Sequence, residues 1–190
     1  DYDAKAWYAE AVSSAVDNGL LYGKSTTVID PNGDMTRAEM AAIINRSFGC
    51  YVKADISKYK DVSKDKWYFE DVAMAVQMGT YNGRSNTAMA PDAPITRQEA
   101  MTVVARALEL DYDSYSKTEL AQFSDTGKIS AWALPYVRAM VGADYIHGRG
   151  KLLAPLDNIT RAEFAQIFYN IIGTYIVSKG TYDEDIKGSV

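Results

Sequence analysis

Cysteine and histidine are almost missing from this sequence: Cys50 and His147 are the single examples among 190 residues. A disulfide within the chain needs two thiols, and a cysteine-based zinc site also needs more than one, so the sequence excludes both. It also lacks a G-x-S-x-G motif, a Cys/His pair and a phosphate-binding glycine loop. We therefore expect no enzymatic activity, no metal and no cofactor.

Long apolar runs and a positive net charge are also missing. No stretch of 18 apolar residues is present, so the sequence predicts no transmembrane helix and no membrane insertion. The formal net charge of −5 argues against nucleic acid as a partner, because such proteins usually carry basic surfaces. Apolar residues make up 47% of the chain, which is typical of a globular protein with its own core.

A calcium loop is also excluded at the acidic segment "DPNGD" from Asp30 to Asp34. Calcium-binding loops place oxygen ligands at alternating positions and end on a bidentate glutamate. Pro31 and Gly33 interrupt that spacing, and the corresponding segments elsewhere read "APDAP" and "APLDN".

What the sequence does contain is a threefold repeat. Each copy begins with a tryptophan, has a glycine 16 residues later, and then a proline followed five residues on by a threonine. The tryptophans are Trp7, Trp67 and Trp132, the glycines Gly23, Gly83 and Gly148, and the threonines Thr36, Thr96 and Thr160. We predict repeats at 1–52, 53–115 and 116–177, followed by a polar tail at 178–190 that we expect to fray.

Each copy has the pattern of two amphipathic helices joined by a loop. The first helix should bury a stripe that includes Trp7, Val12 and Val16, and the tryptophans are assigned to packing, with a sugar contact as a second role. Gly19, Gly79 and Gly142 lie near the expected helix ends. One helix pair buries little apolar surface, so we predict an all-α fold in which the three copies share a core.

The second helix of each copy begins at the motif "TRAE", "TRQE" or "TRAE". Threonine followed three residues later by glutamate predicts a capping box, in which the two side chains bond each other's backbone N–H groups. The pairs are Thr36 with Glu39, Thr96 with Glu99, and Thr160 with Glu163, preceded by the apolar residues Met35, Ile95 and Ile159.

The arginine of the motif has no such local role, because a cation at the N-terminus of a helix opposes the helix dipole. One interpretation is that these arginines, Arg37, Arg97 and Arg161, bind a carboxylate or phosphate with help from nearby N–H groups. The other is that each pairs with an acidic side chain and ties neighbouring copies together. Recurring loop residues favour an acidic sugar as ligand: the cations Lys24, Arg84 and Arg149, and the tyrosines Tyr22, Tyr81 and Tyr145.

These features resemble the S-layer homology domain family, which usually occurs as three tandem copies. The resemblance rests on the tryptophan-led helix, the Gly-to-Pro loop, "MTRAE", "ITRQE" and "ITRAE", and the segments "KDVS" (60–63) and "FSDT" (123–126). It implies a pseudo-threefold, three-pronged spindle with a shared central helical bundle, in an extracellular protein of the bacterial cell wall or S-layer.

The resemblance also implies a function. Grooves between repeats would bind secondary cell-wall polysaccharide non-covalently, through a pyruvylated hexosamine of the N-acetylmannosamine type. Arg37, Arg97 and Arg161 would bind the pyruvate carboxylate, and Gly23, Gly83 and Gly148 would let the backbone approach the sugar. We expect the isolated module to be a monomer.

The loops of this chain differ from those of the family, and a second function stays open. Where family loops often carry a second glycine, this chain has Thr27 and Thr87, and its third copy is one residue shorter, so we expect unequal grooves. The main alternative function is a helical-repeat module that binds another protein. The two are separated by what the recurring cations recognise, an acidic glycan or a protein surface.

Overall fold

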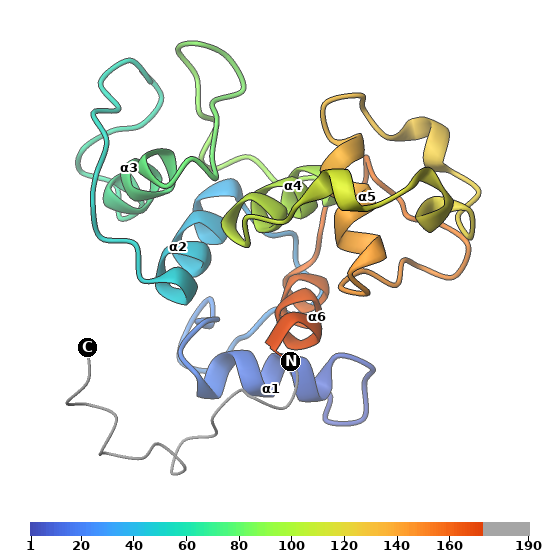
Figure 1. Ribbon diagram of the computed structural model, residues 1–190. Helices are drawn as coiled ribbons and strands as arrows, with labels where there is room; N and C mark the ends of the chain where they lie inside the picture. The colour runs from blue at the N-terminus through green and yellow to red at the C-terminus, as the bar shows by residue number, and fades with distance from the viewer. Residues whose placement is uncertain (173–190) are drawn as a thin grey trace, which may run out of the picture. The chain divides into compact units, whose positions relative to one another are not determined.

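The computed structural model describes residues 1–172, so residues 173–177 of the third predicted repeat and the 178–190 tail lie outside the described residues (Figure 1). Within that range the regular secondary structure is helical, with isolated backbone bridges in place of strands. The all-α prediction is confirmed. The α-helices are α1 (Ala9–Asp17), α2 (Arg37–Phe48), α3 (Phe69–Gln77), α4 (Arg97–Ala107), α5 (Leu134–Gly142) and α6 (Arg161–Ile172). Short 3₁₀ helices are η1 (Tyr112–Ser114), η2 (Lys117–Leu120) and η3 (Thr126–Lys128).

Residue contacts divide the chain into two compact units. The first combines Asp1–Asn32 with the segment that starts at Arg161, and the second comprises Gly33–Thr160. The division cuts the first predicted repeat three residues before its "TRAE" segment and the third between Thr160 and Arg161 of that segment. The predicted repeat boundaries themselves stay a prediction.

In the first unit, α1 packs against α6, which is far from it in sequence (Figure 1). Val12 of α1 and Phe164 of α6 are fully buried, as the apolar stripes require. The Tyr169 hydroxyl donates to the Glu10 carboxylate at 2.6 Å and adds a polar link between the helices. A helix from the third copy is thus the partner of a helix from the first.

The second unit follows the same rule. Helix α2 packs against α3, and α4 packs against α5, so each second helix meets the first helix of the next copy (Figure 1). Helices α2 and α4 are also in contact. The apolar positions of both second helices are buried over most of their length, with Phe48 at the end of α2 exposed. The predicted helices therefore exist, but they pair between copies.

A closed ring of backbone hydrogen bonds joins the three motif segments in this unit. The Met35 N–H donates to Ile159 O, the Ile95 N–H donates to Met35 O, and the Ile159 N–H donates to Ile95 O, each at 3.0 Å. All three side chains are completely buried. Because each residue both donates and accepts, this ring satisfies the backbone of the buried segments with local threefold symmetry.

The predicted burial of the three tryptophans was wrong, while the predicted sugar contact stays a prediction. Trp7, Trp67 and Trp132 are 64%, 62% and 52% exposed. Each first helix begins two residues after its tryptophan, and the residue between them, Tyr8, Tyr68 or Ala133, occupies the buried position. The periodic pattern placed Val12 correctly in the core, but it put the first residue of the stripe one position too early, and Val16 is only half-buried. Three large aromatic side chains are consequently on the surface.

The glycines predicted near the ends of the first helices lie there: Gly142 is the last residue of α5, and Gly19 and Gly79 follow α1 and α3 by two positions. Gly19 and Gly79 adopt positive φ angles of 68° and 76°, and the residue that does so in the third copy is Asp144, at 62°. Counting from these positions aligns Tyr81 with Leu21 and Ile146, all of which are buried. Tyr22 instead aligns with Asn82 and His147. The loop tyrosines are therefore not equivalent positions, although all lie within three residues of the loop glycine.

Candidate functional site

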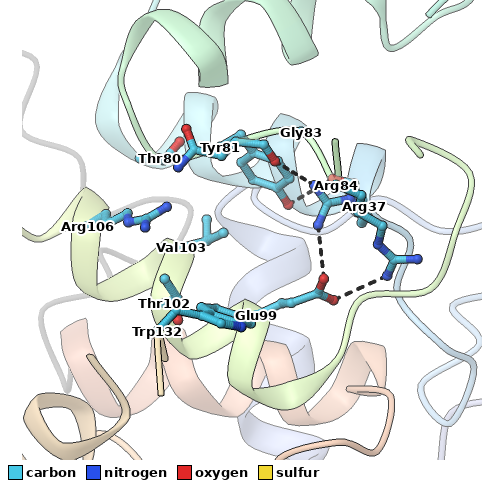
Figure 2. Close-up of a pocket in the computed structure, with 11 residues that line it drawn as sticks. Arg37, Thr80, Tyr81, Gly83, Arg84, Glu99, Thr102, Val103, Arg106 and Trp132 are labelled. Atoms are coloured by element: carbon cyan, nitrogen blue, oxygen red, sulfur yellow. Dashed lines mark hydrogen bonds and ion pairs between the residues drawn. The ribbon is translucent and has the colours of Figure 1, made fainter. Parts of the chain in front are cut away.

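The second unit contains an open pocket of about 390 Å³ (Figure 2). The pocket is lined by residues of all three copies: Arg37 from the first, the loop around Gly83 and helix α4 from the second, and Trp132 from the third. The remaining lining residues are Thr80, Tyr81, Asn82, Arg84, Glu99, Thr102, Val103 and Arg106. Three arginines and one glutamate give this pocket a positive charge in a chain whose net charge is −5.

Arg37 is buried, with 5% of its surface exposed, and its donors point at the loop of the second copy. Its Nε donates to Met89 O at 2.9 Å and its Nη2 donates to Asn82 O at 3.0 Å. Its Nη1 is 3.5 Å from Glu99 Oε1. The guanidinium edge that would chelate a carboxylate is therefore used on backbone carbonyl groups, which fixes the shape of the loop.

The other motif arginines repeat this arrangement. Arg97 donates from Nε to Leu153 O, and Arg161 donates from Nε to Ile29 O, each at 2.9 Å. Both side chains are buried. Nε of all three motif arginines is thus bonded to a backbone carbonyl group, and the predicted role of these arginines in binding an anion stays a prediction. The motif arginine fastens one copy to the loop of another.

Glu99 connects the motif to the pocket. Its carboxylate accepts from the Thr96 N–H at 2.9 Å while the Thr96 hydroxyl accepts from the Glu99 N–H at 3.4 Å, which completes a capping box. Thr36 and Glu39 make the same two bonds at the start of α2. Glu99 Oε2 also lies 3.4 Å from Arg84 Nη2, so Glu99 is placed between two arginines (Figure 2). The Thr160–Glu163 capping box stays a prediction.

The loop that carries Gly83 is tightly built. A Cβ atom on Gly83 would lie 2.5 Å from Ser85 O and 2.5 Å from the Tyr59 ring, closer than real Cβ atoms approach such groups. Tyr81 is buried beneath this loop, its hydroxyl donates to Arg37 O at 2.9 Å, and its ring faces the Arg37 guanidinium 5.2 Å away. Burial raises the pKa of Tyr81, so its hydroxyl stays a donor. Glycine and tyrosine thus shape the pocket wall.

An aspartate from the "KDVS" segment secures the far side of the same loop. The Asp61 carboxylate accepts from the Met89 N–H at 2.9 Å and from the Ala90 N–H at 2.6 Å. Burial works to raise the pKa of Asp61, but these N–H donors outweigh it and the pKa lies below its ordinary value. Asp125 does the same for Leu153 and Ala154. The two matching segments therefore have the same structural role.

Arg106 and Trp132 form the opposite end of the pocket (Figure 2). Arg106 is one turn beyond Thr102 and Val103 on the face of α4 that begins at Glu99, and its Cζ lies 4.9 Å from the centre of the Tyr136 ring. We did not identify Arg106, Thr102 or Val103 as site residues from the sequence. They lie three, four and seven residues after Glu99, a spacing that puts them on the same helix face as Glu99. This spacing could have identified them from the sequence.

The structure brings together some of the predicted residues and leaves others apart. Arg37, Tyr81, Gly83, Arg84 and Glu99 share this pocket with Trp132. In the first unit, Gly23 and Lys24 lie beside Tyr22, which is 64% exposed and whose carbonyl accepts from Arg161. Elsewhere in the second unit, Arg149 follows Gly148 and is paired with Asp157 at 2.9 Å. A binding role for these residues stays a proposal.

The comparisons with known proteins agree with the resemblance noted from the motifs. The sequence pattern of the S-layer homology domain matches residues 1–41, 58–101 and 122–165. The chain is 33% identical over 177 residues, 90% of its length, to the "Surface-layer 125 kDa protein" of Lysinibacillus sphaericus, of which it covers 15%. It is 24% identical over 166 residues to the "S-layer protein sap" of Bacillus anthracis, covering 87% of this chain and 20% of that one.

A third relative has an enzyme's name. The "Exoglucanase XynX" of Acetivibrio thermocellus is 28% identical over 169 residues, which is 87% of this chain and 15% of the relative. The chain thus spans a fifth or less of the length of these relatives. None of the helices in residues 1–172 combines the length and apolar character needed to cross a membrane.

Proposed function

This chain belongs to the S-layer homology domain family, and from that premise we propose that it anchors a larger surface protein by binding an acidic secondary cell-wall polysaccharide non-covalently. Domains of this family are non-catalytic modules of S-layer proteins and surface enzymes, and they act at the bacterial cell surface. The ligand that we propose is a pyruvylated hexosamine of the N-acetylmannosamine type. We propose further that the module itself is non-catalytic and monomeric.

The observation that carries the proposal is the charge and shape of the pocket in the second unit. Three arginines converge on an open pocket of about 390 Å³, a volume suited to one or two sugar rings. Trp132 supplies an exposed aromatic face, against which the apolar face of a sugar can pack. In an acidic protein, such a local concentration of positive charge favours an anionic ligand.

The glutamate of the pocket supports binding more than catalysis. The Glu99 carboxylate accepts from the Thr96 backbone and lies within ion-pair distance of both Arg37 and Arg84. Both carboxylate oxygens are therefore engaged, Oε1 by Arg37 and Oε2 by Thr96 and Arg84. Glu99 is therefore placed to arrange the two arginines.

The roles of the predicted ligand residues can be stated for this pocket. Arg84 contributes charge at the rim, and Arg37 contributes charge through Nη1 while its other donors fix the loop. Gly83 keeps the loop free of a side chain beside the sugar. We propose by analogy that Arg97, Arg161, Lys24, Arg149, Gly23 and Gly148 contribute to binding in the other copies. Several sites acting on one polymer would raise the overall affinity by avidity.

The test is calorimetric titration of the whole chain with purified secondary cell-wall polysaccharide. The native polymer is compared with polymer whose pyruvate ketals have been removed by mild acid. We expect binding to the native polymer, at least tenfold weaker binding to the treated polymer, and weaker binding at high salt. Equal affinity for both polymers would refute recognition of the acidic sugar. Binding to neither would refute anchoring through this polysaccharide and would favour a protein partner.

A further inference from the structure

The three arginines of the pocket differ in how their hydrogen-bonding capacity is used. Arg37 donates to two backbone carbonyl groups and contacts Glu99. Arg84 donates from Nη2 to Pro94 O at 3.2 Å and pairs with Glu99 at 3.4 Å. For either residue to bind a carboxylate edge-on, an existing interaction would have to be broken. Breaking the contacts of Glu99 would also disturb the cap of α4.

Arg106 differs from Arg37 and Arg84 in its hydrogen bonding. Among residues 1–172 its guanidinium has no hydrogen-bond or ion-pair partner, and its one side-chain interaction is the contact with the Tyr136 ring. A contact between a guanidinium and an aromatic ring does not use the N–H groups of the cation, which remain available. Those N–H groups are what a planar carboxylate recognises through two parallel hydrogen bonds. Arg106 therefore lines the pocket with donors that an anion can bind.

The surroundings of Arg106 indicate where a sugar would lie. Trp132 lines the same pocket, and Val103 adds an apolar surface beside it (Figure 2). The group formed by Arg37, Glu99 and Arg84 is at the other end of the pocket in that view. A ligand with a charged group at one end and hydroxyl groups along its length matches this arrangement.

We propose that Arg106 is the residue that binds the carboxylate of the acidic sugar, with the sugar ring packed against Trp132. Arg37, the cation that recurs in the motif of every copy, then acts by shaping the loop. The inference rests on the proposed function and assigns its specificity to a different residue. The position that corresponds to Arg106 in the third copy is Asn170, so the sequence alone gives the second copy a cation that the third lacks.

The test uses two small probes with the whole chain. The first is the methyl glycoside of N-acetylmannosamine with a 4,6-linked pyruvate ketal, and the second is the same compound with its carboxylate converted to a primary amide. The wild-type chain should bind the acid roughly tenfold to a hundredfold more tightly than the amide, as expected for a charge-assisted contact. In Arg106→Gln this preference should disappear. Arg106→Lys should keep part of it, because the charge persists without the fork geometry.

Two matched variants separate a local effect from a change of net charge or fold. Lys64→Gln and Lys66→Gln each remove one positive charge at an exposed position outside the lining of the pocket. Both should retain the preference for the acid, and thermal midpoints would verify that all variants fold. If Arg106→Gln retains the full preference, or if Lys64→Gln abolishes it, the assignment is wrong. If the wild-type chain binds purified polysaccharide and both probes equally, recognition of charge by Arg106 is overturned while anchoring stands. If it binds neither polysaccharide nor probe, the proposed function fails first.

Discussion

Replacing Arg37 by lysine tests whether the motif arginine is mainly a structural residue or mainly a ligand residue. The substitution keeps the positive charge but removes the planar fork of donors. A lysine ammonium cannot reach Met89 O and Asn82 O with the geometry that Nε and Nη2 provide. At least one of these carbonyl groups is then left without its donor. The loop that forms one wall of the pocket loses its attachment to the first copy.

The expected cost follows from burial. Arg37 is 5% exposed, so water does not replace the lost donor, and a buried unsatisfied polar group costs about 1–3 kcal/mol. Adding the weakened contact with Glu99, we expect a total destabilisation of roughly 2–4 kcal/mol. For a chain of this size, 1 kcal/mol corresponds to a shift of about 2–4 °C in the midpoint of thermal unfolding. The midpoint should therefore fall by roughly 5–15 °C.

The measurement is thermal unfolding followed by far-UV circular dichroism, with urea unfolding as a second probe. Arg84→Lys is the matched control, because its guanidinium is exposed and pairs with the same glutamate. Exposed ion pairs contribute less than about 1 kcal/mol, so this variant should unfold close to the wild-type temperature. An Arg37→Lys chain with an unchanged midpoint and abolished glycan binding would refute the structural role and restore the motif arginine as the direct ligand.

Three further predictions concern the loop and the helix ends. Gly83→Ala should destabilise the chain by about 1–3 kcal/mol in urea unfolding because its Cβ would overlap the loop backbone, while Gly127→Ala, where no atom lies within 4 Å, should be neutral within about 0.5 kcal/mol. The pKa of Asp61 is lowered in the folded chain, so the ionised carboxylate stabilises the fold at pH values above its ordinary pKa of 3.8, and this contribution is lost as the pH falls below that value. In Asp61→Asn the free energy of unfolding should therefore fall less steeply with acid than in the wild type. An unchanged dependence on pH would contradict this. Burial and the bond to Asp92 raise the pKa of Tyr68 to about 12, so stability should be lost as pH rises from about 10 toward 12, and Tyr68→Phe should remove that part of the alkaline decline.

The local part of the fold followed from the sequence. Capping boxes at Thr36 and Thr96, helices that begin at the following arginine, and a threefold repetition all depend on residues within a few positions of one another. Periodicity and capping act through local backbone geometry, which a single repeat already specifies. The family followed for the same reason, because its motifs are local and recur three times.

The tryptophans show where local patterns failed. An apolar stripe at helical spacing does not reveal where the helix begins, and a shift of one residue moved Trp7, Trp67 and Trp132 from the core to the surface. The loop tyrosines also do not share one position. Tyr81 lies two residues after Gly79 and aligns with the buried Leu21, whereas Tyr145 directly follows Asp144, the residue with positive φ in the third copy. Their role in binding stays a prediction.

The sequence by itself determined the helical fold, the capping boxes of α2 and α4, the number of copies and the family. Only the tertiary structure decided which copy each arginine meets: Arg37 reaches the loop of the second copy 45 to 52 residues away, and Arg97 reaches that of the third. Such contacts depend on the packing of α2 against α3 and of α4 against α5, which no periodicity encodes. Packing places Arg37 against the loop of the second copy and, among residues 1–172, leaves the guanidinium of Arg106 in the pocket without a hydrogen-bond or ion-pair partner.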